Sequence, residues 1–328
     1  MKSVVVSAIA WVATAVIAAV SLTLGDYDLP LAKVLDTLAG NGSLIMTDVV
    51  VNNRLPRVLV AMGVGTAFAI SGAIFQRLAR NPLVSPDLVG INAGAALAAV
   101  LMITVFGTAT SWLPAGALAG SLLTATSIYL LAYKQGVTGY RLVLVGIGIT
   151  AIVGSITAYL LTLADIYTAK SASMWLAGSL AGRSWSHATL ISITLLVLVP
   201  AAMAGSRQLR LLELGDDLAR ALGGKVELSR GILIAIAVGL AGLATAAAGP
   251  IGFVALVAPQ LARRLLAGGV AGLLPAGAIG ALLVVASDLL ARELFAPTAL
   301  PVGVVTAFLG APYLLLLLAR ANRIDRAG

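Results

Sequence analysis

Long apolar runs, each close to the length that crosses a lipid bilayer as a helix, recur along the whole sequence. The hydrocarbon core of a bilayer is about 30 Å thick and requires about 20 apolar residues per helix. Of the 328 residues, 60% are hydrophobic and only 10% are charged, whereas soluble domains carry about 25% charged residues. These features exclude a single water-soluble globule and predict an all-α polytopic membrane protein. About ten transmembrane helices are expected, at residues 4–24, 57–77, 88–106, 112–133, 142–163, 188–204, 231–248, 250–266, 272–291 and 300–319.

The distribution of basic residues predicts which side of the membrane the termini face. Ten spans place both termini on one side, and with cytoplasmic termini 15 of the 21 lysines and arginines fall at cytoplasmic helix ends and loops. Cytoplasmic loops are enriched in these residues, so both termini are expected in the cytoplasm. The net charge of +8 is explained by this orientation and does not indicate a nucleic-acid partner. Six basic residues would lie outside: Lys33, Arg54, Arg57, Lys170, Arg183 and Arg292.

The chain is expected to form one membrane domain over residues 1–328, because it contains no polar linker and no soluble appended segment. The first apolar run is longer than the core of a signal peptide, which has about 7–15 residues, and is therefore kept as a span. Two loops are long enough to carry function, an external one at about 25–56 and an internal one at about 205–230. The stretch 164–187 contains Trp175 and Trp185, as expected of a segment at a membrane interface.

Several kinds of chemistry are absent from the sequence. The chain has no cysteine and a single histidine, His187, which excludes disulfides, zinc-thiolate sites and HExxH metal sites. No metal site or bound cofactor is expected. The nearest run to a P-loop, Gly223-Gly224-Lys225-Val226, lacks the Ser or Thr and the upstream Gly that bind phosphate and magnesium. The chain is therefore not expected to hydrolyse ATP itself.

The apolar spans carry few ionisable groups. Ion-driven carriers usually keep such groups near the middle of the membrane, but here Asp288, Arg292 and Glu293 fall at the outer end of the ninth span. Asp288 and Arg292 are four residues apart, so they can pair on one helix face. The pattern favours a structural ion pair over a proton relay.

The internal loop contains a short predicted helix with an apolar face. Asp216 and Asp217 stand where a helix start favours negative charge. Leu218, Ala221 and Leu222 share one face, and Gly223-Gly224 closes the unit. A helix of about eight residues is marginal in water, so its apolar face must pack on something. That surface is either the chain's own membrane domain or a groove in a cytosolic partner.

Two arginines flank the outer start of the second span, in Arg54-Leu55-Pro56-Arg57. Pro56 suits the first turn of a helix. The arginines oppose the helix dipole and the inside bias of positive charge, so something acidic should compensate them. Lipid headgroups or an acidic docking protein would do so.

These runs resemble the permease family of ABC importers for ferric siderophores, haem and cobalamin, and the similarity extends in order over nearly the whole chain. Within that family the sequence is most similar to ferric-enterobactin-type subunits. The matching runs are Arg54–Arg57, Ser71–Gln76, Arg80–Leu83, Ser85–Asp87, Gly90–Ala95, Arg210–Asp217, Gly249–Pro259, Asp288–Arg292, Leu300–Thr306 and Leu309–Pro312.

The resemblance implies a bacterial inner-membrane permease that has no ATPase site of its own. It would work with two cytoplasmic ABC ATPase subunits, a second permease chain (a heterodimer is favoured) and a periplasmic substrate-binding protein. Arg54, Arg57 and Arg292 would receive acidic side chains of the binding protein, and Thr138, Gly139 and Tyr140 would form the inner gate. ATPase coupling would fall on the internal loop, at Leu214, Gly215, Asp216, Asp217, Leu218, Ala221, Leu222 and Gly223.

Two departures from the family pattern stand out. Gln260 follows Pro259 where the family usually has His, and Gly268–Ala271 replace a charged Asp-His-Arg. The sequence does not name the cargo. A ferric siderophore, of the catecholate type, is expected, with haem or cobalamin as alternatives and an ion-coupled secondary transporter as a more distant one.

Overall fold

The computed structural model describes residues 2–25, 27–87, 89–107, 112–133, 139–266, 272–294 and 298–324, with backbone alone for 139 and 317–324. All regular elements in these ranges are helices, which confirms the predicted all-α class. Each of the ten expected segments is helical. They are α1 (Lys2–Thr23), α4 (Leu55–Leu78), α5 (Ile91–Thr104), α6 (Leu113–Ala132), α7 (Gly139–Leu163), α9 (Trp185–Ala204), α12 (Val226–Ala248), α13 (Val254–Leu265), α14 (Leu273–Glu293) and α15 (Val302–Ile324).

The ten helices differ in length. In the described part of the chain seven are long and apolar enough to cross a membrane, and two shorter apolar stretches lie at Ile91–Thr104 and Val302–Leu316. The remaining helix, α13, has 12 residues and is about 18 Å long at 1.5 Å per residue. It cannot cross the bilayer alone, because the backbone of residues 249–253 leaves the helical path before it.

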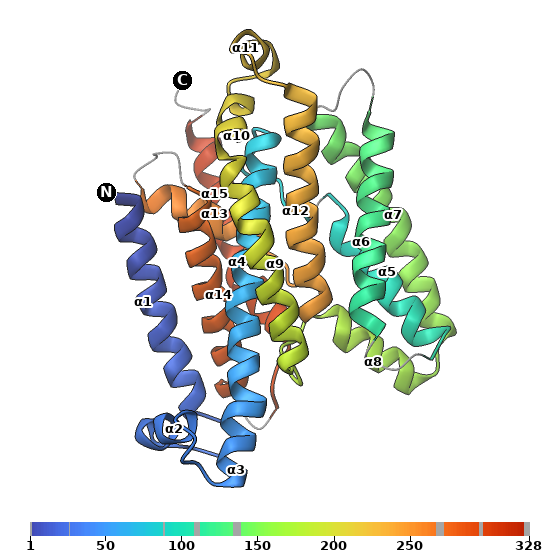
Figure 1. Cartoon of the computed structure of the whole chain (residues 1–328). Helices are drawn as coiled ribbons and strands as arrows, with labels where there is room; N and C mark the ends of the chain where they lie inside the picture. Colours follow the sequence, from blue (N-terminus) through green and yellow to red (C-terminus); the bar gives the residue numbers. More distant parts are fainter. Residues whose placement is uncertain are drawn as a thin grey trace.

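Shorter helices lie in the external loop, the internal loop and the interfacial stretch that were predicted from the sequence. The external loop contains α2 (Leu31–Leu38), α3 (Leu44–Thr47) and η1 (Asp48–Arg54), a π-helix that runs directly into α4. The expected interfacial stretch forms α8 (Ile166–Leu176), and the internal loop forms α10 (Ser206–Glu213) and α11 (Asp216–Ala221). In Figure 1, α11 stands at one end of the molecule and α2 and α3 at the other.

Helix α4 is the centre of the bundle, and nearly all of its side chains are buried. It packs against α9, α12, α13 and α14 (Figure 1). At two crossings glycine lets backbones touch. A Cβ at Gly65 would overlap the carbonyl oxygen of Gly280 on α14, and one at Gly72 would overlap that of Ala255 on α13. Small residues at such crossings are what allow helices to pack closely in lipid.

Non-helical backbone from Gly249 to Phe253 separates α12 from α13. Gly249 has φ +78° and Phe253 has φ +67°, a left-handed conformation that is uncommon for a residue with a side chain. Between α4 and α5, the described residues 79–87 and 89–90, which include Asn81-Pro82 and Ser85-Pro86, form no helix.

Helix α1 begins and α15 ends on the side of the molecule that carries α11 (Figure 1). Both ends of the described chain thus lie on one side, as an even number of spans requires. The assignment of that side to the cytoplasm stays a prediction from the distribution of basic residues.

Replacing Gly65 by Ala should destabilise the bundle, because the added methyl group meets the backbone of α14. Overpacking of this kind costs about 1–3 kcal/mol, and we expect a lower Tm of the purified protein in detergent. The matched control is Gly154→Ala on α7, where a Cβ would meet nothing within 4 Å. An equal Tm for the two variants would contradict the proposed backbone contact.

Candidate functional site

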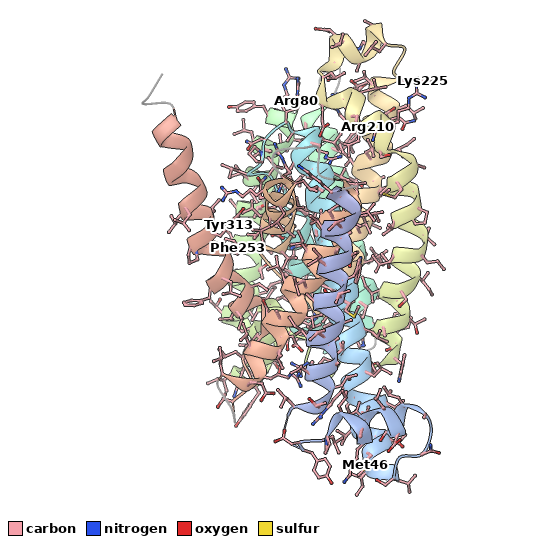
Figure 2. The ribbon with its side chains drawn as sticks, turned by 90° about the vertical axis from the view of Figure 1, so that its left-hand side faces the viewer. Met46, Arg80, Arg210, Lys225, Phe253 and Tyr313 are labelled. Atoms are coloured by element: carbon pink, nitrogen blue, oxygen red, sulfur yellow. The ribbon has the colours of Figure 1, made fainter. Side chains whose placement is uncertain are left out.

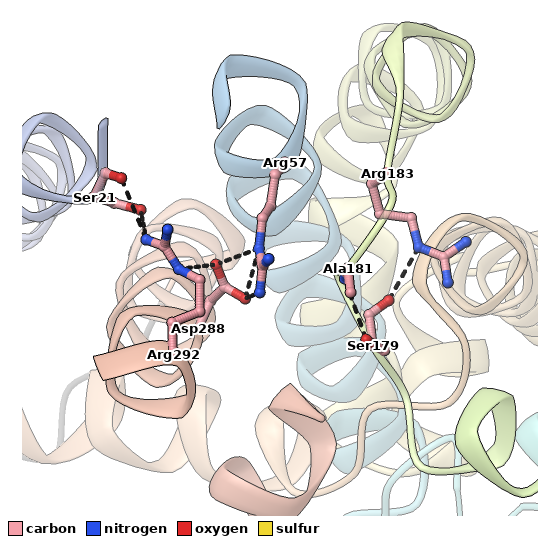
Figure 3. A network of polar contacts seen from close by, with 7 residues as sticks. All are labelled: Ser21, Arg57, Ser179, Ala181, Arg183, Asp288 and Arg292. Carbon is pink, nitrogen blue, oxygen red and sulfur yellow. Dashed lines mark hydrogen bonds and ion pairs between the residues drawn. The ribbon is translucent and has the colours of Figure 1, made fainter. Parts of the chain in front are cut away.

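At the end of the bundle opposite α11, two arginines from distant parts of the chain share one buried carboxylate (Figure 3). Arg57 on α4 donates to both carboxylate oxygens of Asp288 on α14, with Nη2 2.8 Å from Oδ1 and Nε 3.0 Å from Oδ2. Arg292, one turn further along α14, places Nε 3.7 Å from Oδ2 of Asp288 and donates from Nη2 to the Ser21 hydroxyl at 2.6 Å. The predicted pairing of Asp288 with Arg292 is confirmed. The closer partner of Asp288 is Arg57, 231 residues away along the chain.

The side chain of Arg54 is buried and forms hydrogen bonds within its own chain. It is 8% exposed and donates to the carbonyl oxygens of Leu22 at 2.8 Å and Tyr27 at 2.7 Å. These bonds fix the segment after α1 to the start of α4. The guanidinium of Arg54 thus binds backbone carbonyls of its own chain, and its expected pairing with lipid or with an acidic partner stays a prediction.

A fourth arginine belongs to this region and was not among the predicted site residues. Arg183, in the loop between α8 and α9, donates from Nε to the carbonyl of Ser179 at 3.0 Å (Figure 3), and its Nη1 lies 3.3 Å from Nε2 of His187. Burial and the nearby charge of Arg57 lower the pKa of Arg183. Its position in an outer loop was the only sequence signal that could have marked it.

We call Arg54, Arg57, Arg183, Arg292 and Asp288 the arginine cluster. Guanidinium groups of Arg54 and Arg292 both lie within 4 Å of one point beside Gly25. Arg57 and Arg292 contact the buried Asp288. By contrast, Arg54 and Arg183 bind backbone carbonyls nearby. Glu293 is exposed beside Arg292. The cluster carries four positive charges against one carboxylate, although Arg57 and Arg292 are only 19% and 12% exposed.

At the opposite end, α10 and α11 form a unit that projects beyond the bundle (Figure 1). The predicted helix is six residues long, from Asp216 to Ala221, with Asp216 and Asp217 in its first turn. Gly215 before it has φ +104°, and Gly223 after it has φ +79°, so both ends require glycine. Ala219 is the buried member of the helix.

The apolar face of α11 points away from its own membrane domain. Leu214, Leu218 and Leu222 are 55%, 49% and 57% exposed, and Asp217, Ala221 and Gly223 are exposed beside them. Of the two alternatives left open by the sequence, packing on the chain's own domain is therefore not what these leucines do.

Buried ion pairs brace this unit against two long helices. Asp216 accepts from Arg230 of α12 at 2.6 Å, and Glu213 of α10 pairs with Arg77 of α4 at 3.2 Å. Arg230 also reaches Glu227 at 3.3 Å and is itself 7% exposed. Through these ion pairs, a displacement of the α10–α11 unit would act directly on α4 and α12.

The predicted gate residues are placed only in part. Thr138 lies outside the described residues, and Gly139 begins α7 with its backbone alone described. Tyr140 follows in the first turn of α7 and is 77% exposed. Its side chain is therefore available to a second chain or to a pathway.

Near the α12–α13 break, buried amides hold irregular backbone. Gln260 donates from Nε2 to Oε1 of Gln76 and to the carbonyl of Pro82, both at 2.9 Å. Gln76 in turn donates to the carbonyl of Leu256 at 3.1 Å. Gln260, where the family usually has His, thus ties α13 to α4 and to the 79–90 segment.

The same break borders two cavities. Phe253 lines one of about 230 Å³ with Leu283, Thr306 and Tyr313, and one of about 330 Å³ with Asp87. Figure 2 shows Phe253 and Tyr313 near one another beside α15.

Asn92 organises the polar wall of the second cavity. It donates to Asp87, and it accepts from the hydroxyl of Thr245 at 2.8 Å. These bonds tie the 79–90 segment to the end of α12.

Asp288→Asn should destabilise the protein strongly, because Arg57 and Arg292 would lose their shared carboxylate. Breaking a buried charge pair costs about 3–5 kcal/mol, and we expect a clear fall in Tm in detergent. Asp217→Asn is the matched control, since the Asp217–Arg220 pair is exposed on both sides and such pairs contribute about 0–1 kcal/mol. Equal stability of the two variants would rule out a structural role for Asp288.

Comparison with known proteins places this architecture in a family. The chain is 43% identical over 299 residues to the ferric enterobactin transport system permease protein FepG of Escherichia coli (strain K12), covering 91% of both chains. It is 40% identical to the hemin transport system permease protein HmuU of Yersinia pestis, covering 84% of each. A transporter assigned to the metal-chelate type of ABC transporters, solved in an inward-facing conformation, matches with a TM-score of 0.85 and 28% identity over 94% of this chain and 97% of that one.

The model of the FecCD transport family matches residues 13–320. The match covers the arginine cluster, the α10–α11 unit and the α12–α13 break in one continuous alignment. The chain therefore belongs to the FecCD transport family.

Proposed function

We propose that this chain is the transmembrane permease subunit of an ABC importer in a bacterial inner membrane, and that it moves a ferric siderophore from a periplasmic binding protein to the cytoplasm. The observation that carries the proposal is the exposed leucine face of α11, braced to α4 and α12 by ion pairs. A protein with no P-loop of its own needs such a contact surface to receive energy from a separate ATPase. Enterobactin, the cargo in the name of one relative, favours a catecholate siderophore.

In this proposal the energy of ATP enters through the α10–α11 unit. Two ATPase subunits would bind ATP, close on one another and move this unit in each of two permease chains, with a heterodimer favoured. Arg230 and Arg77 would pass that motion to α12 and α4. The inner gate at Thr138, Gly139 and Tyr140 would then open beside the second chain. No bound cofactor is required of the permease itself.

Reconstitution tests this function directly. Liposomes are prepared with the chain, its second permease chain and the ATPase, and the binding protein is included in the assay. The uptake of ferric enterobactin, haem and cobalamin is then compared. We expect ATP-dependent accumulation of the ferric siderophore. Preferential uptake of haem, the cargo type in the name of the hemin relative, would reassign the cargo. Uptake driven by an ion gradient without ATP would contradict the proposal of an ABC importer.

The arginine cluster supports a docking role based on long-range attraction. Its guanidinium groups are largely buried, so tight new ion pairs with Arg54 are not favoured. A field of several like charges does raise the association rate of an acidic partner. We propose that Arg57 and Arg292 face acidic side chains of the binding protein, while Arg54 positions the loop that carries them.

Arg57→Gln should slow association with the binding protein by about three- to tenfold at low salt and weaken the salt dependence of that rate. Surface plasmon resonance on the purified transporter measures both. Arg57→Lys keeps the charge and should remain near wild type. Lys170→Gln, which removes an exposed outer cation on α8 outside the cluster, is the second control. A similar loss in Lys170→Gln would argue against a specific role for the cluster.

Replacing Leu218 and Leu222 together by Ser should separate ATP hydrolysis from transport. A leucine buried at an interface contributes about 1.5–3 kcal/mol, so the double variant should bind the ATPase at least tenfold more weakly. Co-purification and cargo-stimulated ATPase activity measure the effect. Leu35→Ser on α2, an equally exposed leucine at the other end of the molecule, should change neither. Normal coupling in the double variant would contradict the role of α11.

A further inference from the structure

A groove of about 450 Å³ lies between the start of α10, the end of α11 and the first turns of α12. Arg207 and Lys225 stand on its rim, and Gln208 and Ser229 add polar groups. Its remaining walls include the apolar side chains of Leu211, Leu222, Leu228 and Ile232. Figure 2 shows Lys225 at the edge of the molecule, at the level of the α10–α11 unit.

The two rim cations are left over when the acids of this region are paired. Glu213 pairs with Arg77, Asp216 with Arg230, Asp217 with Arg220, and Glu227 with Arg230. No acidic residue lines the groove, and no ion pair of Arg207 or Lys225 is found in the described part of the chain. The groove therefore presents two positive charges without a carboxylate.

The apolar wall continues along the membrane-facing side of α12. Leu228 and Ile232 lie one turn apart and are 58% and 52% exposed, and Ala235 is exposed one turn beyond them. Lys225 immediately precedes α12, which is long and apolar enough to span a membrane. The cations thus stand at the depth of lipid headgroups, and the apolar strip begins where acyl chains begin.

We propose that this groove binds an anionic phospholipid, with its phosphate between Arg207 and Lys225 and its acyl chains along Leu228 and Ile232. Basic pockets between transmembrane helices are a known type of anionic headgroup site. A soluble phosphate or an acidic side chain of a partner would satisfy the cations and leave the apolar strip uncovered. The bound lipid would join α10 to α12 under α11, in addition to the Arg230–Asp216 pair. The binding itself does not depend on which cargo the protein carries.

Native mass spectrometry of the intact transporter complex in detergent tests the site. Phosphatidylglycerol and phosphatidylethanolamine with identical acyl chains are titrated separately. We expect retention of phosphatidylglycerol at concentrations where phosphatidylethanolamine is not retained. In the double variant Arg207→Gln/Lys225→Gln its affinity should fall at least tenfold, since each basic side chain near an anionic lipid contributes about fivefold.

The matched control is Arg210→Gln/Arg263→Gln, which removes two exposed cations outside the groove and should change the affinity less than twofold. Each variant is first shown to keep the wild-type Tm, and the retention of its ATPase subunits is measured alongside lipid binding. Equal retention of the two lipids by the wild type, or equal losses in the two double variants, would overturn the proposal.

Two further outcomes would also overturn it. Displacement of phosphatidylglycerol by equimolar glycerol 3-phosphate would assign the groove to a soluble anion. Loss of the ATPase subunits from Arg207→Gln/Lys225→Gln, with lipid retention unchanged, would assign the cations to an acidic surface of that partner. Uptake assays take no part in either readout, so a failure here is distinct from a failure of the importer function.

Discussion

Close contact between helix backbones holds this bundle together. Lipid tails are as apolar as the helices, so the hydrophobic effect does not drive helices together inside the membrane, and close packing has to supply the stability. Helix α4 meets α14 at Gly65 and Gly280 and meets α13 at Gly72, with no room for a side-chain carbon at either crossing. The position of α4 follows from these contacts, and with it the positions of Arg57 in its first turn and Arg77 in its last turn.

A second constraint governs the places where helices stop inside the bundle. Backbone that leaves a helix at membrane depth must find its hydrogen bonds within the protein. Here the carbonyl of Pro82, between α4 and α5, accepts from Gln260. Gln76, which accepts from Gln260, donates to the carbonyl of Leu256 in the first turn of α13. Long polar side chains from α4 and α13 thus supply hydrogen bonds beside the irregular segments.

The sequence was sufficient to predict the helices and the short helix of the internal loop, since these depend on local patterns of apolar residues, acidic residues and glycine. It could not predict contacts between distant residues. Asp288 was expected to pair with Arg292, four residues away, but its main partner is Arg57, 231 residues away. The sequence also did not indicate that Arg54 binds the carbonyl oxygens of Leu22 at the end of α1 and Tyr27 in the following loop. The length of α13 was overestimated because its apolar run continues through a break that only Gly249 and Pro250 signal.

The two long helices that brace the α10–α11 unit are built differently, and this difference bears on how motion could pass through the protein. Helix α4 is continuous from Leu55 to Leu78 and is enclosed along its length, so Arg57 and Arg77 are held about 30 Å apart by one unbroken rod. Helix α12 is bound to the same unit by the ion pair of Arg230 with Asp216, but α12 ends just before Gly249. Beyond that break lies Phe253, in a strained conformation between two cavities. Displacement of the α10–α11 unit is therefore resisted by α4 and can be absorbed at the far end of α12, where open space and backbone strain coincide.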